Sequence, residues 1–155
     1  PLESVARIGR HINERFLVLF GDVANQTNLR KMSELHHSTG ATATLVCRDT
    51  DHPHDSDMVM QSDDNLVTEV LPKSEDRVAP NGALGNVGTY LMEPRALDFA
   101  RISDHCDFFV DLFQPMLDHG ERLAAYETTD FAMDIGTPER YARTIKTFPR
   151  RPPHR

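Results

Sequence analysis

An uncharged apolar run, residues 16–20 (Phe-Leu-Val-Leu-Phe), constrains the fold of this chain more than any other segment. A continuous apolar run that stops at a glycine is typical of a strand with both faces buried. We therefore predict a fully buried strand over residues 16–21, with Asp22 directly at its carboxyl end. In open α/β sheets, ligands bind outside the carboxyl ends of the strands. Gly21 and Asp22 are thus the first candidate site residues.

The segment after this run predicts a helix followed by a second strand. Apolar residues recur at helical spacing within 28–39, and Gly40 suits the left-handed position that ends a helix. β-branched residues alternate along 41–47, which is typical of a strand. A strand, a helix and a strand within about thirty residues indicate a parallel βαβ unit. The chain is therefore predicted to be an α/β protein.

The remainder of the chain predicts further strands and short helices. Strands are expected at 58–60, 66–71, 84–92, 122–126 and 131–134. Pro115 should kink an amphipathic helix over 109–117 or break it into two pieces, and Pro94 should open a short helix. Thr137 should cap the final helix, because threonine is a favoured N-cap and Pro138 suits the first helical position.

A second carboxylate, Asp134, ends the last predicted strand, just before Ile135-Gly136 and the final helix. Either aspartate alone is most simply explained as a turn residue. Because both close strands where the next segment turns away, we expect Asp22 and Asp134 to lie at one edge of one sheet. Mg²⁺ usually takes one or two carboxylates together with substrate phosphates. The pair is therefore a candidate magnesium site.

Three further residues are weaker candidates, each with a structural alternative. Asn86 and Gly88 alternate in the strand over 84–92, and a strand glycine often marks the close approach of a ligand or of another backbone. Tight packing explains them equally well. Lys73 follows a strand and could reach an anionic group, but a solvated surface lysine is the more common situation.

The eight histidines do not show the paired spacing of a zinc site. His36 and His37 are adjacent on a predicted helix, and we assign both to its surface. Cys47 lies within a predicted strand, so we expect it to belong to the core and not to act as a nucleophile.

Composition narrows the class of protein. A formal net charge of −7 over 155 residues argues against general nucleic-acid binding, which needs a basic face. No apolar stretch approaches the roughly 20 residues that span a bilayer, and no signal-peptide pattern is visible. Two cysteines do not make a disulfide framework, so a reducing cytoplasm is expected. We expect one domain over residues 1–148 and a linker or tail over 149–155.

Three segments stand in the order and spacing of a known family. They are 16–22, 86–90 (Asn-Val-Gly-Thr-Tyr) and 126–141, which ends in Asp-Ile-Gly-Thr-Pro-Glu-Arg-Tyr. On these segments the chain resembles the sugar-1-phosphate nucleotidyltransferases, and most of all their mannose- and heptose-1-phosphate guanylyltransferase branch. Residues 1–6 look like a degraded form of the family's Pro-Leu-Gly-Thr-Ala segment. The family's glycine-rich amino-terminal loop precedes that segment, so we expect this chain to lack it.

The resemblance implies a doubly wound, mostly parallel (mixed), Rossmann-like sheet, of which this chain would be the carboxy-terminal portion. It implies an enzyme that condenses a nucleoside triphosphate, GTP favoured, with a mannose- or heptose-type sugar 1-phosphate and releases pyrophosphate. Such nucleotide sugars serve as lipopolysaccharide or capsule precursors. By the same resemblance, Asp22 and Asp134 would hold Mg²⁺, and Lys73 would touch the sugar phosphate. The substrate-binding residues would be Gly21, Asn86 and Gly88.

Two other functions stay open on the sequence. The chain could be a non-catalytic sugar-phosphate-binding or regulatory module, or a fragment of a bifunctional enzyme fused to a phosphatase. The expected partners are a nucleoside triphosphate and a sugar 1-phosphate, with no nucleic acid and no membrane. A homo-oligomer or a fused second domain is compatible with each reading.

Overall fold

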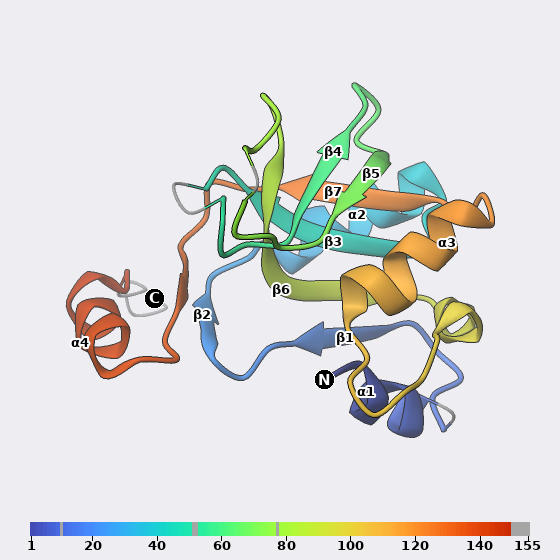
Figure 1. Ribbon diagram of the computed structural model, residues 1–155, viewed down its shortest axis with the longest axis horizontal. Helices are drawn as coiled ribbons and strands as arrows, with labels where there is room; N and C mark the ends of the chain where they lie inside the picture. The colour runs from blue at the N-terminus through green and yellow to red at the C-terminus, as the bar shows by residue number, and fades with distance from the viewer. Residues whose placement is uncertain (10, 51–52, 77, 150–155) are drawn as a thin grey trace, which may run out of the picture.

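The computed structural model describes residues 1–9, 11–50, 53–76 and 78–149, which form a mixed sheet between layers of helices (Figure 1). The main sheet has six strands in the order β5-β4-β6-β3-β7, and β1 also pairs with β6. Its strands are β1 (Phe16–Leu19), β3 (Ala43–Arg48), β4 (Met58–Gln61), β5 (Val67–Leu71), β6 (Leu84–Met92) and β7 (Leu123–Glu127). A separate two-stranded sheet pairs β2 (Val23–Asn25) with β8 (Ala132–Asp134). Of the predicted tail over 149–155, all but Pro149 lies outside the described residues.

Strand β6 makes the sheet mixed. It is antiparallel to β1, β3 and β4, so these three run the same way, and β7 joins them because it pairs in parallel with β3. β5 runs with β6. Most strands of the described sheet therefore share one direction, although β3 and β7 are its one parallel pair of neighbours. The predicted α/β class is confirmed. The predicted parallel unit of β1, helix α2 (Leu29–Thr39) and β3 is altered, because β6 lies between its two strands.

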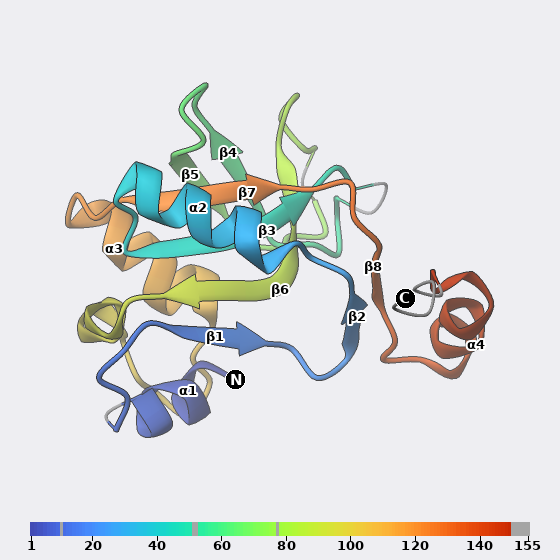
Figure 2. The same ribbon diagram turned by 180° about the vertical axis from the view of Figure 1, so that it is seen from behind.

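Helices cover both faces of the main sheet. Helix α2 (Leu29–Thr39) lies across β3, β6 and β7 on one face (Figure 2). The other face carries α1 (Leu2–Gly9), the 3-10 helix η1 (Pro94–Phe99), the π-helix η2 (Phe109–Phe113) and α3 (Gln114–Asp118). Helix α4 (Pro138–Thr147) stands beside β8, away from the main sheet (Figure 1). Within the described ranges, no helix has the length and apolar character that crossing a bilayer requires.

Alternating side chains build a core on each face of the sheet. On β3, Leu45 and Cys47 join the larger core under η2 and α3, while Val46 packs with Met32 of α2 on the opposite face. Cys47 is fully buried, as predicted, and burial raises the pKa of its thiol. A thiol held protonated in the core is a poor nucleophile.

The predicted helix ends are confirmed where polar caps mark them. The Asn28 side chain accepts the Lys31 N–H at 3.1 Å at the start of α2, and Gly40 ends that helix with φ of 61°. Thr137 likewise accepts a backbone N–H at 3.2 Å at the start of α4. Pro115 lies where the π-helix passes into α3, and the backbone stays helical at Phe113 and Gln114, so the structure has a change of helix type there and no break.

The prediction of a fully buried strand over residues 16–21 is wrong. β1 ends at Leu19, and its side chains alternate: Val18 is buried, but Leu17 is 40% and Leu19 57% exposed. Within the described residues β1 pairs with β6 alone, and α2 lies over the other strands of that face. The apolar run therefore forms an uncharged edge strand whose outward leucines face solvent.

We expect the 155-residue chain to self-associate through β1, because an uncharged apolar edge is a template for strand pairing between molecules. Leu19→Lys places a charge on the outward face and should shift the chain towards monomer. Sedimentation velocity over a range of protein concentrations measures the change. Val78→Lys, at an 89% exposed loop position, is the control and should leave association unchanged. A wild-type chain that stays monomeric at every concentration would contradict the expectation.

Candidate functional site

The pairing of β2 with β8 brings Asp22 and Asp134 together. Val23 lies opposite Asp134 in the register, and the Ile135 N–H donates to the Asp22 carbonyl oxygen at 2.7 Å. A Cβ built on Gly136 would lie 3.1 Å from Asp134 Oδ1 and 3.9 Å from Asp22 Oδ2. The two carboxylates thus face the same small space, so the structure brings together the pair that the sequence selected.

The pair lies on the small sheet and not on an edge of the main sheet, which corrects the sequence-based placement. Asp22 occupies the turn between β1 and β2, and Asp134 is the last residue of β8. Each strand of the small sheet has three residues. So short a segment carries no periodic pattern, and the sequence therefore did not indicate β2.

The two oxygens of Asp134 have different partners. Oδ1 accepts the Gly136 N–H at 2.7 Å, while Oδ2 forms an ion pair with Arg140 Nη1 at 3.1 Å. Sequence analysis gave Arg140 no role, although its place in the first turn of α4 sets it next to the end of β8. A positive charge therefore already lies beside Asp134.

The donor set suits Mg²⁺. Asp22 and Asp134 are both exposed, and Mg²⁺ keeps waters or substrate phosphate oxygens as its remaining ligands. Across the described ranges, no group of three or more His, Cys, Asp or Glu side chains is placed to hold a metal ion. A cation at the pair would therefore need oxygens from water or substrate to complete its shell.

At Gly88, strand β6 comes into close contact with the segment that leads to Asp22. Its φ is 73°, and a Cβ at this position would lie 2.9 Å from the Phe20 ring. The Phe20 N–H donates to the Gly88 carbonyl oxygen at 2.9 Å, and the Phe20 ring packs edge-on against Tyr90. Because Phe20 leads directly into Gly21, this packing fixes the turn that presents Asp22. A substrate contact for Gly88 remains a prediction.

Asn86 braces the bend at Gly88. Its Oδ1 accepts the Gly88 N–H at 2.9 Å, and its Nδ2 donates to the Tyr90 hydroxyl at 2.9 Å. Burial raises the pKa of Tyr90, so the phenol stays protonated. The amide is thus engaged within its own strand, and a sugar contact for Asn86 remains a prediction.

Asp57 ties the loop of Lys73 to the start of β6. The Lys73 N–H donates to Asp57 Oδ1 at 2.8 Å, and the Asp57 carbonyl oxygen accepts the Asn86 N–H at 2.8 Å. The Lys73 side chain is exposed, which agrees with a surface lysine and leaves it free to reach an anion. Sequence analysis missed Asp57, whose signal was an acidic residue directly before a strand.

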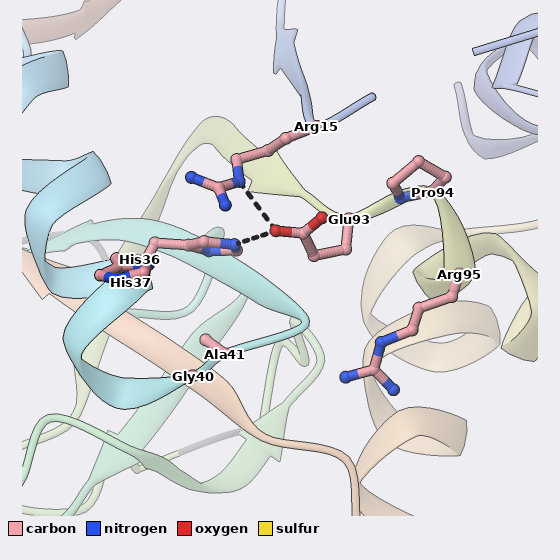
Figure 3. A pocket seen from close by; sticks show the side chains of 8 residues that line it. All are labelled: Arg15, His36, His37, Gly40, Ala41, Glu93, Pro94 and Arg95. Carbon is pink, nitrogen blue, oxygen red and sulfur yellow. Dashed lines mark hydrogen bonds and ion pairs between the residues drawn. The ribbon is translucent and has the colours of Figure 1, made fainter. Parts of the chain in front are cut away.

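A hollow of about 460 Å³ lies at the opposite end of the sheet (Figure 3). It is lined by Arg15, His36, His37, Gly40, Ala41, Glu93, Pro94 and Arg95. Arg15 precedes β1 whereas Asp22 follows it, so the hollow is remote from the carboxylate pair. Arg15 pairs with Glu93 at 2.8 Å and Arg95 with Glu121 at 2.8 Å. Each arginine already has a glutamate partner, and the hollow therefore offers a ligand little uncompensated charge.

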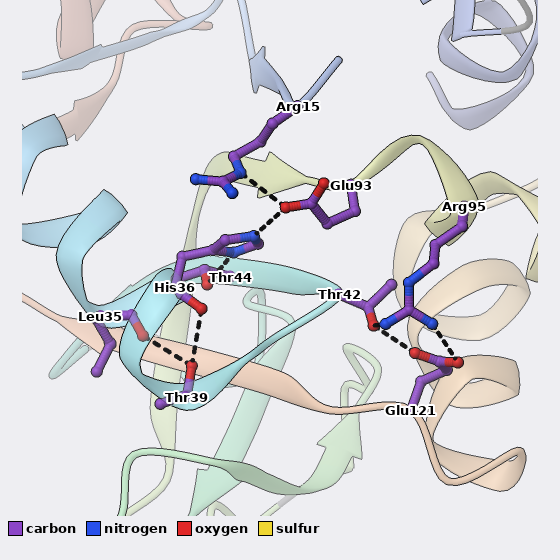
Figure 4. Close-up of polar contacts among 9 residues, drawn as sticks. All are labelled: Arg15, Leu35, His36, Thr39, Thr42, Thr44, Glu93, Arg95 and Glu121. Atoms are coloured by element: carbon purple, nitrogen blue, oxygen red, sulfur yellow. Dashed lines mark hydrogen bonds and ion pairs between the residues drawn. The ribbon is translucent and has the colours of Figure 1, made fainter. Parts of the chain in front are cut away.

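His36 lies in a buried polar cluster beside this hollow, so its predicted surface position is wrong (Figure 4). The side chain is 1% exposed, with Nδ1 2.8 Å from Thr44 Oγ1 and Nε2 3.1 Å from Glu93 Oε1. Because a carboxylate accepts only, Nε2 carries the proton and Nδ1 accepts from Thr44. The neighbouring His37 is exposed, as predicted.

Burial lowers the pKa of His36, against the opposing effect of Glu93. Burial also opposes ionisation of Glu93, but hydrogen bonds from Arg15 and His36 outweigh it and hold the pKa of that carboxyl below its usual value. His36 is therefore a neutral structural residue that links α2 to β3 and to the end of β6.

Comparison with known proteins gives the family. A sequence profile described as Nucleotidyl transferase matches residues 3–150. The chain is 26% identical over 141 residues to Mannose-1-phosphate guanyltransferase 2 of Candida glabrata, covering 90% of this chain and 38% of that protein. It is 26% identical over 149 residues to UTP--glucose-1-phosphate uridylyltransferase of Synechocystis sp., covering 94% and 38%. The solved structure of a UTP-bound UGPase from Acinetobacter baumannii matches with a TM-score of 0.75 at 19% identity, covering 95% of this chain and 55% of that one.

The structural match shows that the chain shares the α/β fold of these transferases. The chain belongs to the nucleotidyl transferase family, because the profile takes in nearly its whole length. It spans 38% of the length of each of the two curated relatives.

We expect Gly88→Ala to lower the free energy of unfolding by about 2–4 kcal/mol, because it combines a strained positive φ with displacement of the Phe20 ring. Gly82→Ala is the control, since Gly82 has a φ of 84° but nothing within 4 Å of a built Cβ. Gly82→Ala should lower the free energy of unfolding by only about 1–2 kcal/mol, which is the cost of a positive φ at alanine. Urea unfolding of both variants measures the difference, and equal losses would refute the close contact.

The free energy of unfolding should fall as pH drops below about 6.5, because the unfolded chain then protonates His36 before the folded chain does. His36 can change the free energy of unfolding by at most about 1.4 kcal/mol per pH unit. This dependence stops below the pKa of His36 in the folded chain, where both states are protonated. The polar and charged groups that act on the His36 ring are Glu93, Thr44, Arg15 and His37.

His36→Gln should flatten the stability profile between pH 7.5 and 5.5, measured by chemical denaturation at each pH. His37→Gln is the control, because that side chain is exposed and should leave the profile unchanged. An unchanged slope in His36→Gln would show that this histidine does not titrate on unfolding.

Proposed function

We propose that this chain is the metal-binding and sugar-phosphate-binding portion of a sugar-1-phosphate nucleotidyltransferase. The complete protein would condense a nucleoside triphosphate with a sugar 1-phosphate to give a nucleotide sugar and pyrophosphate. One observation carries the proposal: in a chain of the nucleotidyl transferase family, Asp22 and Asp134 face one space beside Gly136.

The reaction needs no covalent protein nucleophile. An oxygen of the sugar phosphate attacks the α-phosphorus in line and pyrophosphate leaves, so catalysis is positioning and charge neutralisation. Asp22 and Asp134 would hold Mg²⁺, which when bound supplies positive charge to the phosphates. Lys73 would place its ammonium against the sugar phosphate from the exposed loop after β5. The residues proposed to line the sugar site are Gly21, Asn86 and Gly88.

GTP and a mannose- or heptose-type sugar 1-phosphate are the substrates that we propose to test first. The Candida glabrata relative is named for mannose 1-phosphate and guanylyl transfer, which supports this choice. The Synechocystis relative is named for UTP and glucose 1-phosphate, so the other triphosphates belong in the same assay. A role in lipopolysaccharide or capsule precursor synthesis depends on the sugar found. The free, buried Cys47 and Cys106 support a reducing cytoplasm as the location.

In the complete protein, Asp22→Asn and Asp134→Asn should each cut turnover by about 10²-fold or more, because each keeps the side-chain shape but removes a ligand charge. Pyrophosphate release from GTP with mannose or heptose 1-phosphate, beside the other triphosphates, measures the loss. Full activity in both variants would remove the proposed metal role.

His37→Ala is the control for that assay, since its side chain is exposed and lies at the other end of the sheet. His36→Ala is unsuitable as a control because His36 is buried against Glu93. The 155-residue chain alone should show little transfer, because it spans only 38% of the length of each relative that is named for this activity. Binding of a sugar 1-phosphate without turnover by the complete protein would favour the non-catalytic module.

A further inference from the structure

Arg140 lies between two carboxylates from different parts of the chain. Its Nη1 is 3.1 Å from Asp134 Oδ2, and its Nη2 is 3.9 Å from Asp55 Oδ2. All three side chains are about half exposed or more, so the guanidinium can exchange partners without crossing the core. Arg140 is anchored through its backbone, since its N–H donates to the Thr137 cap at 3.2 Å.

The position of Arg140 matters for the proposed metal site. Asp134 turns Oδ1 towards Gly136, beside which Asp22 Oδ2 also lies, and Oδ2 towards Arg140. A divalent cation held by Asp22 and Asp134 would sit next to a guanidinium that already uses one of these carboxylates. The two cations repel one another, and they seek the same negative charge.

We propose that Arg140 competes with the divalent cation for Asp134 and that Asp55 is the alternative partner to which the guanidinium moves. The proposal rests on the proposed function, which assigns Asp22 and Asp134 to the metal. Without a cation, Arg140 offsets the repulsion between the two exposed carboxylates. With a cation present, Asp55 takes the guanidinium and Asp134 is released to the metal.

This exchange makes Arg140 a residue that sets the affinity for the cation and not a metal ligand itself. Removing its charge should therefore tighten cation binding, whereas removing a ligand weakens it. Charge effects at exposed sites are modest, so we expect a gain of about three- to tenfold.

Mn²⁺ binding to the 155-residue chain, followed by the electron paramagnetic resonance signal of free Mn²⁺, tests the exchange without any turnover. Arg140→Gln and Arg140→Ala should bind Mn²⁺ about three- to tenfold more tightly than the wild type. The first variant keeps most of the side-chain length, which guards against loss of folding. Arg143→Gln is the matched control, because Arg143 is an exposed arginine on the same helix and loses the same charge. It should change the affinity by less than about twofold.

A double-mutant cycle tests the role of Asp55. Asp55→Asn removes the same negative charge from the wild type and from Arg140→Gln. The loss of charge by itself should therefore change Mn²⁺ affinity equally in both. If Asp55 is the alternative partner of Arg140, Asp55→Asn should weaken Mn²⁺ binding more in the wild-type background than in the Arg140→Gln background. Equal effects in the two backgrounds would overturn the exchange with Asp55.

The outcomes separate this proposal from the proposed function. Binding that Asp134→Asn abolishes, with unchanged or weaker affinity in Arg140→Gln, would overturn the competition and leave the metal site standing. No Asp134-dependent Mn²⁺ binding in the wild type or in Arg140→Gln would contradict both. Tighter binding in both Arg140 variants but not in Arg143→Gln is the result that supports the competition.

Discussion

The left-handed bend at Gly88 is the constraint on which the site depends. It lies inside β6, the strand that pairs with β1, β3 and β4, and lets the Phe20 ring come against the backbone where any side chain would block it. Phe20 then packs with Tyr90 and Phe108 in the aromatic part of the core. Since the next residues are the turn that presents Asp22, core packing fixes the position of the first carboxylate.

The second carboxylate is placed by a different device. β8 returns from the far end of the chain to pair with β2, and Gly136 leaves the space that both carboxylates face. Arg140, at the start of α4, balances the charge on one side. The candidate site therefore joins a rigid part, set by the main sheet, to a peripheral part set by three-residue strands.

Sequence patterns predicted the elements whose signals are local. The end of α2 at Gly40, the cap at Thr137 and the change of helix type beside Pro115 depend on neighbouring residues only, so they could be predicted without the tertiary structure. The burial of His36 depends on Thr44 and Glu93, which arrive from other elements. The exposure of β1 likewise depends on which strands and helices lie beside it. The meeting of Asp22 and Asp134 was expected from strand ends and family resemblance, but the small sheet that achieves it left no periodic signal.

The small sheet also gives the site a thermodynamic character of its own. Isolated two-stranded pairings are marginally stable in water, so β2 and β8 should separate far more often than the strands at the centre of the main sheet. A ligand that bridges Asp22 and Asp134 recognises only the closed arrangement and shifts this local opening equilibrium by mass action. Bound substrate would then stabilise the pairing of β2 with β8, and the amide hydrogens of these two strands would exchange more slowly in its presence.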